Sequence, residues 1–157
     1  MRCSRLVAPA AVCAMLTLAY GPARAEQRPA EEIRPRVEHH LRAADDLAQH
    51  FGTVLTAECP KFDSRDAWRA YFDGEIDRVV LMMAHLEQAW TEAKRTGDDD
   101  VRRAAKAPRR RVDEARTLVG KLQQCANGYG TSFSPSAVWR RIERDVPLRQ
   151  SDVALPQ

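Results

Sequence analysis

The sequence lacks the short motifs by which many small enzymes and cofactor-binding proteins are recognised. It contains no phosphate-binding loop, no His-Glu-x-x-His, no Gly-x-Ser-x-Gly and no calcium-loop pattern. It also contains no Cys-x-x-Cys pair, so thioredoxin-type redox chemistry is unsupported. No acid–base or nucleophile constellation can be assembled from the remaining side chains. We therefore expect a protein that is not an enzyme and has no bound cofactor.

Alternation of apolar and polar residues, the pattern of a half-buried β-strand, is also missing. Apolar residues recur instead every three or four positions along most of the chain, which is typical of amphipathic helices. About 130 residues remain after the N-terminal segment described next, and they suffice for one domain with a continuous core. The expected fold class is therefore all-α.

Residues 1–25 have the three-part layout of a secretory signal peptide. A short basic segment is followed by the apolar run 6–20 and by Ala23-Arg24-Ala25, which places small residues two apart before Glu26. The apolar run is shorter than the ~20 residues that span a bilayer. Cleavage after Ala25 predicts a periplasmic or secreted protein.

Two alternatives to cleavage stay open. The first is lipidation of Cys13, although a lipidation signal requires a small side chain where Val12 stands. The second is retention of the segment as an uncleaved anchor. Cleavage remains the preferred interpretation.

Removal of the signal peptide changes the composition. The whole chain has 25 basic and 22 acidic residues, and three of its arginines lie in the first 25 residues, so the mature chain is formally neutral with 22 of each. The basic character that would favour nucleic acid as a partner disappears. Only Cys59 and Cys125 remain, an even pair of cysteines in an oxidising compartment.

The first two helices follow from apolar spacing. The first is expected from Ile33 to Cys59, where Pro60 stops it. The second begins after a cap at Asp63 or Ser64 and continues to Gly97. At 1.5 Å per residue, the second helix reaches roughly 50 Å.

Two further helices are predicted in the second half of the chain. A third helix opens at 98–100 (Asp-Asp-Asp), continues past Pro108 with a kink and ends at Asn127-Gly128. A shorter fourth helix follows Ser134-Pro135 and ends at Pro147. Residues 26–146 then form the helical bundle domain, and residues 147–157 form an irregular C-terminal tail.

Short connections predict the topology. The two loops between the first three helices enforce up-down-up packing, so the C-termini of the first and third helices share one end of the bundle. Cys59 and Cys125 lie at those two C-termini. We therefore predict a bundle of three long helices plus a short fourth C-terminal helix, cross-linked by a Cys59–Cys125 disulfide.

Other roles for these two cysteines are less well supported. They could pack as free thiols at the edges of the apolar stripes. A nucleophilic cysteine needs a nearby base, and no histidine lies within a helical turn of either residue. Covalent haem attachment needs Cys-x-x-Cys-His, but Leu122 and Ala126 occupy the positions of the second cysteine and the histidine around Cys125.

The histidines raise one competing function. In an antiparallel pair of helices His40 and Met83 fall at similar height, and a His/Met pair can ligate haem iron. A small periplasmic haem or metal carrier using these two residues is the alternative to a binding protein. His39, Asp46 and His50 share a polar face, but His39 and His50 lie about 16 Å apart along a helix, too far for one metal ion. Asp46 and His50 could join a weak surface site, but a solvated face is the preferred interpretation.

Charge is distributed unevenly along the mature chain. Residues 26–100 hold 10 basic and 17 acidic residues, whereas residues 101–157 hold 12 basic and 5 acidic ones. One interpretation is intramolecular pairing between a basic and an acidic helix. The other is a docking patch for an anionic partner, with Trp139 as the aromatic best placed beside it. The candidate patch consists of Arg102, Arg103, Lys106, Arg109, Arg110, Arg111, Arg140 and Arg141.

These observations favour an exported, non-enzymatic helical bundle that acts as a periplasmic binding, scaffold or chaperone-like accessory. The expected partner is a protein or an anionic envelope component, and a peripheral contact with a membrane is compatible with the patch. Nucleic acid is not expected as a partner.

Overall fold

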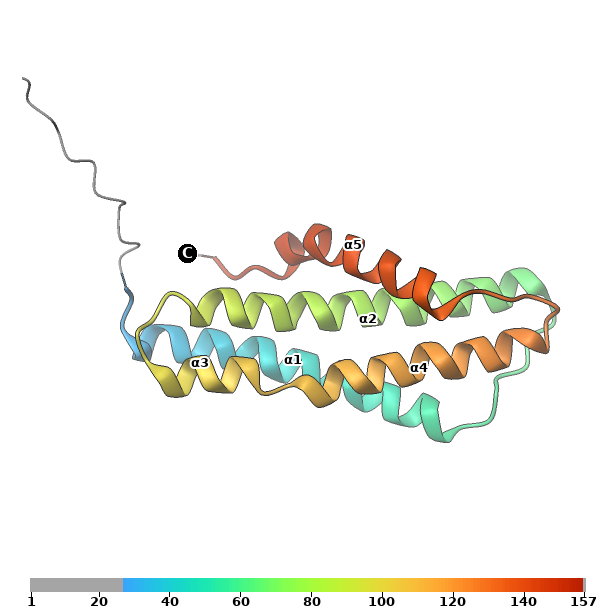
Figure 1. Ribbon diagram of the computed structural model, residues 1–157, viewed down its shortest axis with the longest axis horizontal. Helices are drawn as coiled ribbons and strands as arrows, with labels where there is room; N and C mark the ends of the chain where they lie inside the picture. Colours follow the sequence, from blue (N-terminus) through green and yellow to red (C-terminus); the bar gives the residue numbers. More distant parts are fainter. Residues whose placement is uncertain (1–26, 157) are drawn as a thin grey trace, which may run out of the picture.

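The computed structural model describes residues 27–156, and all regular secondary structure in that range is helical. The predicted signal peptide, including Cys13, lies outside the described residues. None of the described helices is both long and apolar enough to cross a bilayer. Figure 1 shows five helices, which are α1 (Ala30–Thr56), α2 (Arg65–Ala93), α3 (Asp99–Lys106), α4 (Arg109–Asn127) and α5 (Pro135–Val153).

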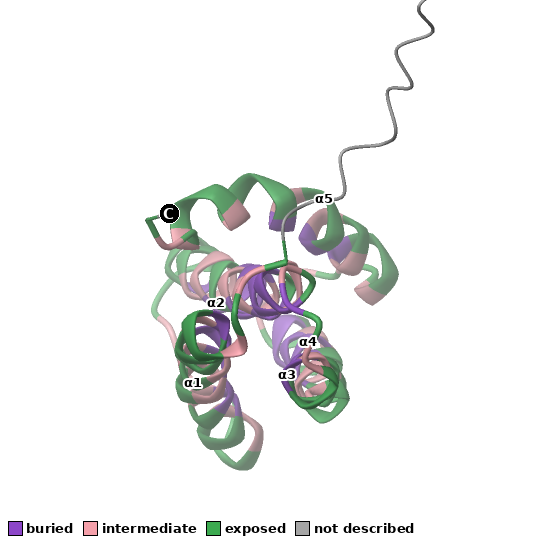
Figure 2. Ribbon diagram, turned by 90° about the vertical axis from the view of Figure 1, so that its left-hand side faces the viewer, coloured by how far each residue is buried: buried purple, intermediate pink, exposed green. Residues whose placement is uncertain are grey.

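The helices form an up-down-up-down bundle. α2 runs antiparallel to α1, α3 and α4 continue one another in the opposite direction to α2, and α5 returns beside α2 (Figure 1). Seen from its end, the bundle has α5 on one side of α2, and α1 and the α3–α4 pair on the other (Figure 2). The predicted all-α, up-down-up arrangement of the first three helical segments is confirmed.

Local sequence explains where the helices begin and why the third is interrupted. Ser64 caps α2, its hydroxyl accepting a hydrogen bond from the Ala67 amide, and Asp98 caps α3 by accepting one from the Val101 amide. Pro108 separates α3 from α4 because proline lacks the amide hydrogen that a continuous helix needs. The prediction of one helix kinked at Pro108 is therefore wrong in detail, because Ala107 and Pro108 separate two helices that continue in the same direction.

The fourth predicted helix is longer than expected. α5 continues through Pro147 to Val153, so the prediction that 147–157 is an irregular tail is wrong for its first half. Contacts with α2 explain the continuation: the side-chain amide Nε2 of Gln150 donates to Gln88 Oε1 at 3.2 Å and to Thr91 Oγ1 at 3.3 Å. These contacts hold the last turns of α5 although Pro147 removes one backbone hydrogen bond.

Two apolar clusters fill the bundle. The larger one joins all the long helices and includes Phe51, Ile76, Met82, Leu118 and Ile142, each fully buried. A smaller cluster lies where α1, α2 and α3 meet, at the end of the bundle near the α2–α3 loop. Its members are Ile33, Val37, Ala89, Ala93, Val101 and Ala105.

The predicted disulfide joins Cys59 to Cys125, with a Cα–Cα distance of 5.4 Å. Cys59 lies just beyond the end of α1, and Cys125 lies in the last turn of α4. The same end of the bundle is tied a second time by Tyr129, whose hydroxyl donates to the Pro60 carbonyl at 2.7 Å and accepts from the Phe62 amide at 2.8 Å. The α1–α2 loop is therefore fastened covalently to the last turn of α4 and by hydrogen bonds to the loop that follows α4.

Candidate anion-binding surface

The predicted basic patch does not form one surface. Its α5 members lie on one side of α2, whereas its α3 and α4 members lie on the other side (Figure 2). A partner would therefore meet one of two separate groups. The α3–α4 group contains Arg102, Arg103, Lys106, Arg109, Arg110 and Arg111, and the α5 group contains Arg140 and Arg141.

The α5 group is partly engaged inside the protein. Arg141 donates to Asp73 Oδ1 on α2 at 2.9 Å, and this hydrogen bond raises the pKa of the arginine further. Trp139 is also occupied, because the guanidinium of Arg116 on α4 lies 5.0 Å from its ring centroid. Arg140 remains exposed. The predicted role of Trp139 as a free aromatic beside the patch is therefore not supported by its position.

Two arginines in the first turn of α4, Arg110 and Arg111, are also paired with carboxylates. Arg111 donates to Asp45 Oδ1 on α1 at 2.7 Å and pairs with Glu114 at 3.3 Å. Burial lowers the pKa of Arg111, but its hydrogen bonds to the carboxylates of Asp45 and Glu114 and their negative charges raise it overall. Arg110 pairs with Glu114 at 3.0 Å. Arg111, which reaches Asp45 on α1, fits the intramolecular interpretation of the charge asymmetry, whereas Arg110 pairs with Glu114 of its own helix.

The remaining cations of the group surround Trp90, a half-buried residue of α2. The Lys106 ammonium lies 4.7 Å from the Trp90 ring centroid and the Lys94 ammonium lies 5.9 Å from it, within the range of cation–π attraction. Together they border a surface hollow of about 540 Å³. Its lining consists of Trp90, Lys94, Asp99, Arg102, Arg103 and Lys106.

These cations have few internal counter-charges. Arg103 pairs only with exposed Asp100, at 3.4 Å, a geometry that contributes little energy. Arg102, Lys106 and Arg109 take part in no ion pair within residues 27–156. Positive charge is therefore left available to an external group on this side of the bundle.

A second hollow, of about 480 Å³, adjoins the first and shares Trp90 and Lys106 with it. It lies against the interruption between α3 and α4, where Pro108 breaks the helix. Most of its lining is apolar, and it also contains one anion and two cations. The lining residues are Met83, Leu86, Glu87, Trp90, Ala105, Lys106, Pro108, Arg109 and Val112.

Sequence reasoning missed Trp90, Lys94 and Met83 as members of this surface. Trp90 lies in the apolar stripe of its helix and was expected in the core. One signal in the sequence was available: Trp90 and Lys94 are four residues apart, so a helix places them on the same face.

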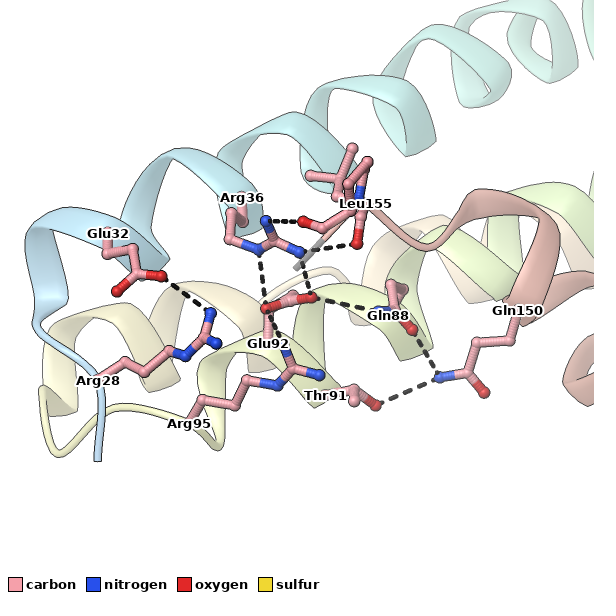
Figure 3. Close-up of polar contacts among 10 residues, drawn as sticks. Arg28, Glu32, Arg36, Gln88, Thr91, Glu92, Arg95, Gln150 and Leu155 are labelled. Carbon is pink, nitrogen blue, oxygen red and sulfur yellow. Dashed lines mark hydrogen bonds and ion pairs between the residues drawn. The ribbon is translucent and has the colours of Figure 1, made fainter. Parts of the chain in front are cut away.

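Near the α2–α3 loop, the buried carboxylate of Glu92 on α2 contacts Arg36 on α1, which in turn contacts the C-terminal segment (Figure 3). Glu92 is fully buried and accepts hydrogen bonds from Arg36 at 3.1 and 3.2 Å and from Arg95 at 3.2 Å. Burial raises the pKa of Glu92, but the two arginines outweigh burial and lower it overall. Arg36 also donates to the carbonyls of Leu155 and Pro156, at 3.0 and 2.7 Å, which fastens the C-terminal segment to α1.

His40 and Met83 do not share a site. His40 is fully buried between α1 and α2, with its Nδ1 3.1 Å from Nδ1 of His85, whereas Met83 lines the apolar hollow beside α3 and α4. Burial, followed by the neighbouring His85 and His39, lowers the pKa of His40 to about 4. The ring is therefore neutral at physiological pH. Its Nε2 has no hydrogen-bond partner among the described residues.

The weak surface site considered for Asp46 and His50 is not formed. His50 does not join Asp46 but contacts the buried carboxylate of Glu75 on α2, with its Nε2 2.9 Å from Oε2. His39 and Asp46 both line a shallow polar hollow on α1. Across residues 27–156, no group of three or more histidine, cysteine, aspartate or glutamate side chains is arranged to hold a metal ion.

Comparison with known proteins adds no assignment to this geometry. No protein-family model, no curated protein and no solved structure matches the chain significantly. The functional argument therefore rests on the chain's own residues.

Proposed function

We propose that the protein is an exported, non-enzymatic helical bundle that acts as a binding, scaffold or chaperone-like accessory in the periplasm. Its partner is an anionic protein or envelope component. The partner contacts what we call the Trp90 surface, formed by Trp90, Lys94, Arg102, Arg103, Lys106 and Arg109.

One observation supports this choice of surface over the rest of the basic residues. At the Trp90 surface, Arg102, Lys106 and Arg109 take part in no ion pair among the described residues, whereas Arg111 and Arg141 are bound to acidic residues of α1 and α2. Concentrated charge of one sign beside a low-dielectric wall attracts ligands of the opposite sign. Because the mature chain is formally neutral, such attraction is local rather than a property of the whole molecule.

The proposal predicts selective retention on an immobilised acidic polymer such as polyglutamate. The test compares the chain from residue 26 onward with the variant Arg102→Gln/Lys106→Gln/Arg109→Gln. The matched control is Arg140→Gln/Arg144→Gln/Arg149→Gln, which removes the same charge from exposed positions of α5. The first variant should elute at clearly lower salt than both the unmodified chain and the control. Equal elution of the two variants would contradict the proposed surface.

Export is tested separately, by the intact mass of protein recovered from the periplasm after expression of the full sequence. The expected mass begins at Glu26 and is two hydrogens below that of the reduced chain, because Cys59 and Cys125 are oxidised. A retained first segment would contradict the proposed export by cleavage. A bound haem or metal would favour the carrier alternative.

A further inference from the structure

We infer that the Trp90 surface binds the phosphate-bearing headgroups of an anionic lipid bilayer, with the upper acyl region of one lipid entering the adjoining apolar hollow. This inference rests on the proposed function and specifies the chemistry of its partner. An acidic protein is the competing occupant, and the experiment below separates the two.

The first argument is that the two hollows are neighbours. Trp90 and Lys106 line both the cationic hollow and the apolar one, so a single ligand lying across these two side chains would reach both hollows. A lipid carries a phosphate and a hydrocarbon chain within one molecule. It would satisfy the cations around Trp90 and cover Met83, Leu86 and Val112 at once. A purely acidic segment such as polyglutamate would satisfy the charges but leave the apolar lining in water.

The second argument concerns the residue types. Tryptophan is favoured at the boundary between water and hydrocarbon, because its ring is apolar and its indole N–H is polar. Lysine and arginine can lay their methylene stems along an apolar surface while their charged ends reach headgroups. Trp90 with Lys94 and Lys106 over its ring combines both features.

The third argument is the balance of charge. The two hollows together are lined by five cations and two anions, the latter being Asp99 and Glu87. Elsewhere the first half of the mature chain is acidic, with 17 acidic and 10 basic residues between 26 and 100. An anionic bilayer would therefore attract the α3 side and repel acidic parts of α1 and α2, which orients the bundle on the surface.

The first experiment measures binding to vesicles of phosphatidylcholine with and without phosphatidylglycerol by co-sedimentation. The mature chain should bind only the anionic vesicles. Each cation near an anionic surface changes the partition coefficient about fivefold, so Arg102→Gln/Lys106→Gln/Arg109→Gln should lower it on the order of 100-fold. The charge-matched α5 variant Arg140→Gln/Arg144→Gln/Arg149→Gln should lower it far less. Circular dichroism establishes that both variants are folded.

The second experiment tests the apolar half of the surface. Met83→Ser should weaken vesicle binding several-fold while leaving polyglutamate binding unchanged. Leu148→Ser, at the exposed leucine of α5, is the matched control and should change neither. In parallel, the tryptophan emission should shift to shorter wavelength on vesicle binding. Trp90→Phe should abolish that shift and Trp139→Phe should retain it.

The outcomes separate the two proposals. Binding to anionic vesicles that depends on both the cations and Met83 supports the lipid inference. Binding to polyglutamate through the same cations, without vesicle binding, overturns the lipid inference and leaves the proposed function standing with an acidic protein as partner. Binding to neither probe overturns both.

Discussion

Buried His40, which faces half-buried His85 between α1 and α2, should make the bundle less stable in mild acid. His40 is fully buried, its pKa is lowered from 6.5 to about 4, and its ring faces His85, whose pKa burial and the neighbouring His39 also lower. His39 and Arg36 add positive charge nearby, while Glu92 is the only one of these neighbours that favours protonation of His40. Adding a proton to the folded protein is therefore unfavourable.

The sign and size follow from linkage between folding and protonation. Well above pH 6.5 the imidazole of His40 is neutral in both the folded and the unfolded state and contributes no pH dependence. As the pH falls from 6.5 towards 4, the unfolded chain binds a proton that the folded chain resists, so the free energy of unfolding decreases. At 1.36 kcal/mol per pKa unit, the loss between pH 7 and pH 4 is about 3 kcal/mol. His85 changes stability in the same direction.

The assay is urea denaturation followed by circular dichroism at several pH values across this range, with the disulfide intact. His40→Gln removes the titrating ring but keeps a neutral polar side chain facing His85. Between pH 7 and pH 4, the free energy of unfolding of this variant should decrease by about 3 kcal/mol less than that of the unmodified protein. His39→Gln, at the exposed neighbouring position, should retain most of the acid sensitivity. Parallel pH profiles for His40→Gln and the unmodified protein would refute the reasoning.

Two further predictions concern the ends of the bundle. Replacing Cys59 and Cys125 by serine should lower the free energy of unfolding by about 4 kcal/mol, since the bond closes a loop with a sequence separation of 66. Urea titration measures this change, and an unaltered midpoint would count against the cross-link as a stabilising element. Glu92→Gln should lower the free energy of unfolding by about 3 kcal/mol. Arg36 and Arg95 would keep their positive charges, but the glutamine beside them would carry no negative charge. Glu87→Gln, on the exposed face of the same helix, should cost less than 0.5 kcal/mol; similar losses for the two variants would contradict the role given to Glu92.

Local physical chemistry made the helices and the disulfide predictable. Ser64, Asp98 and Pro108 act within one turn of their own position, so their effects on helix ends do not depend on the rest of the fold. The disulfide needed one more step. Long helices joined by short loops must pack antiparallel, which brings the ends carrying Cys59 and Cys125 together.

The extent of α5 illustrates the opposite case. Proline normally ends a helix, and the prediction stopped at Pro147 for that reason. The helix continues because Gln150 reaches Gln88 and Thr91 on α2. These partners lie about sixty residues away in sequence, so no local pattern announces them.

The candidate surface also has features that local sequence determines and features that only tertiary packing determines. The sequence by itself determined which segment is basic, but the charges of Arg111 and Arg102 look equivalent in it. Only the packing of α4 against α1 places Asp45 beside Arg111 and leaves Arg102 facing a hollow with Trp90. Likewise the sequence shows a histidine at position 40, but only the register of α1 against α2 places its ring next to His85. Helix formation depends on neighbours within one turn, whereas ion pairs, burial and pKa depend on which faces of distant helices meet.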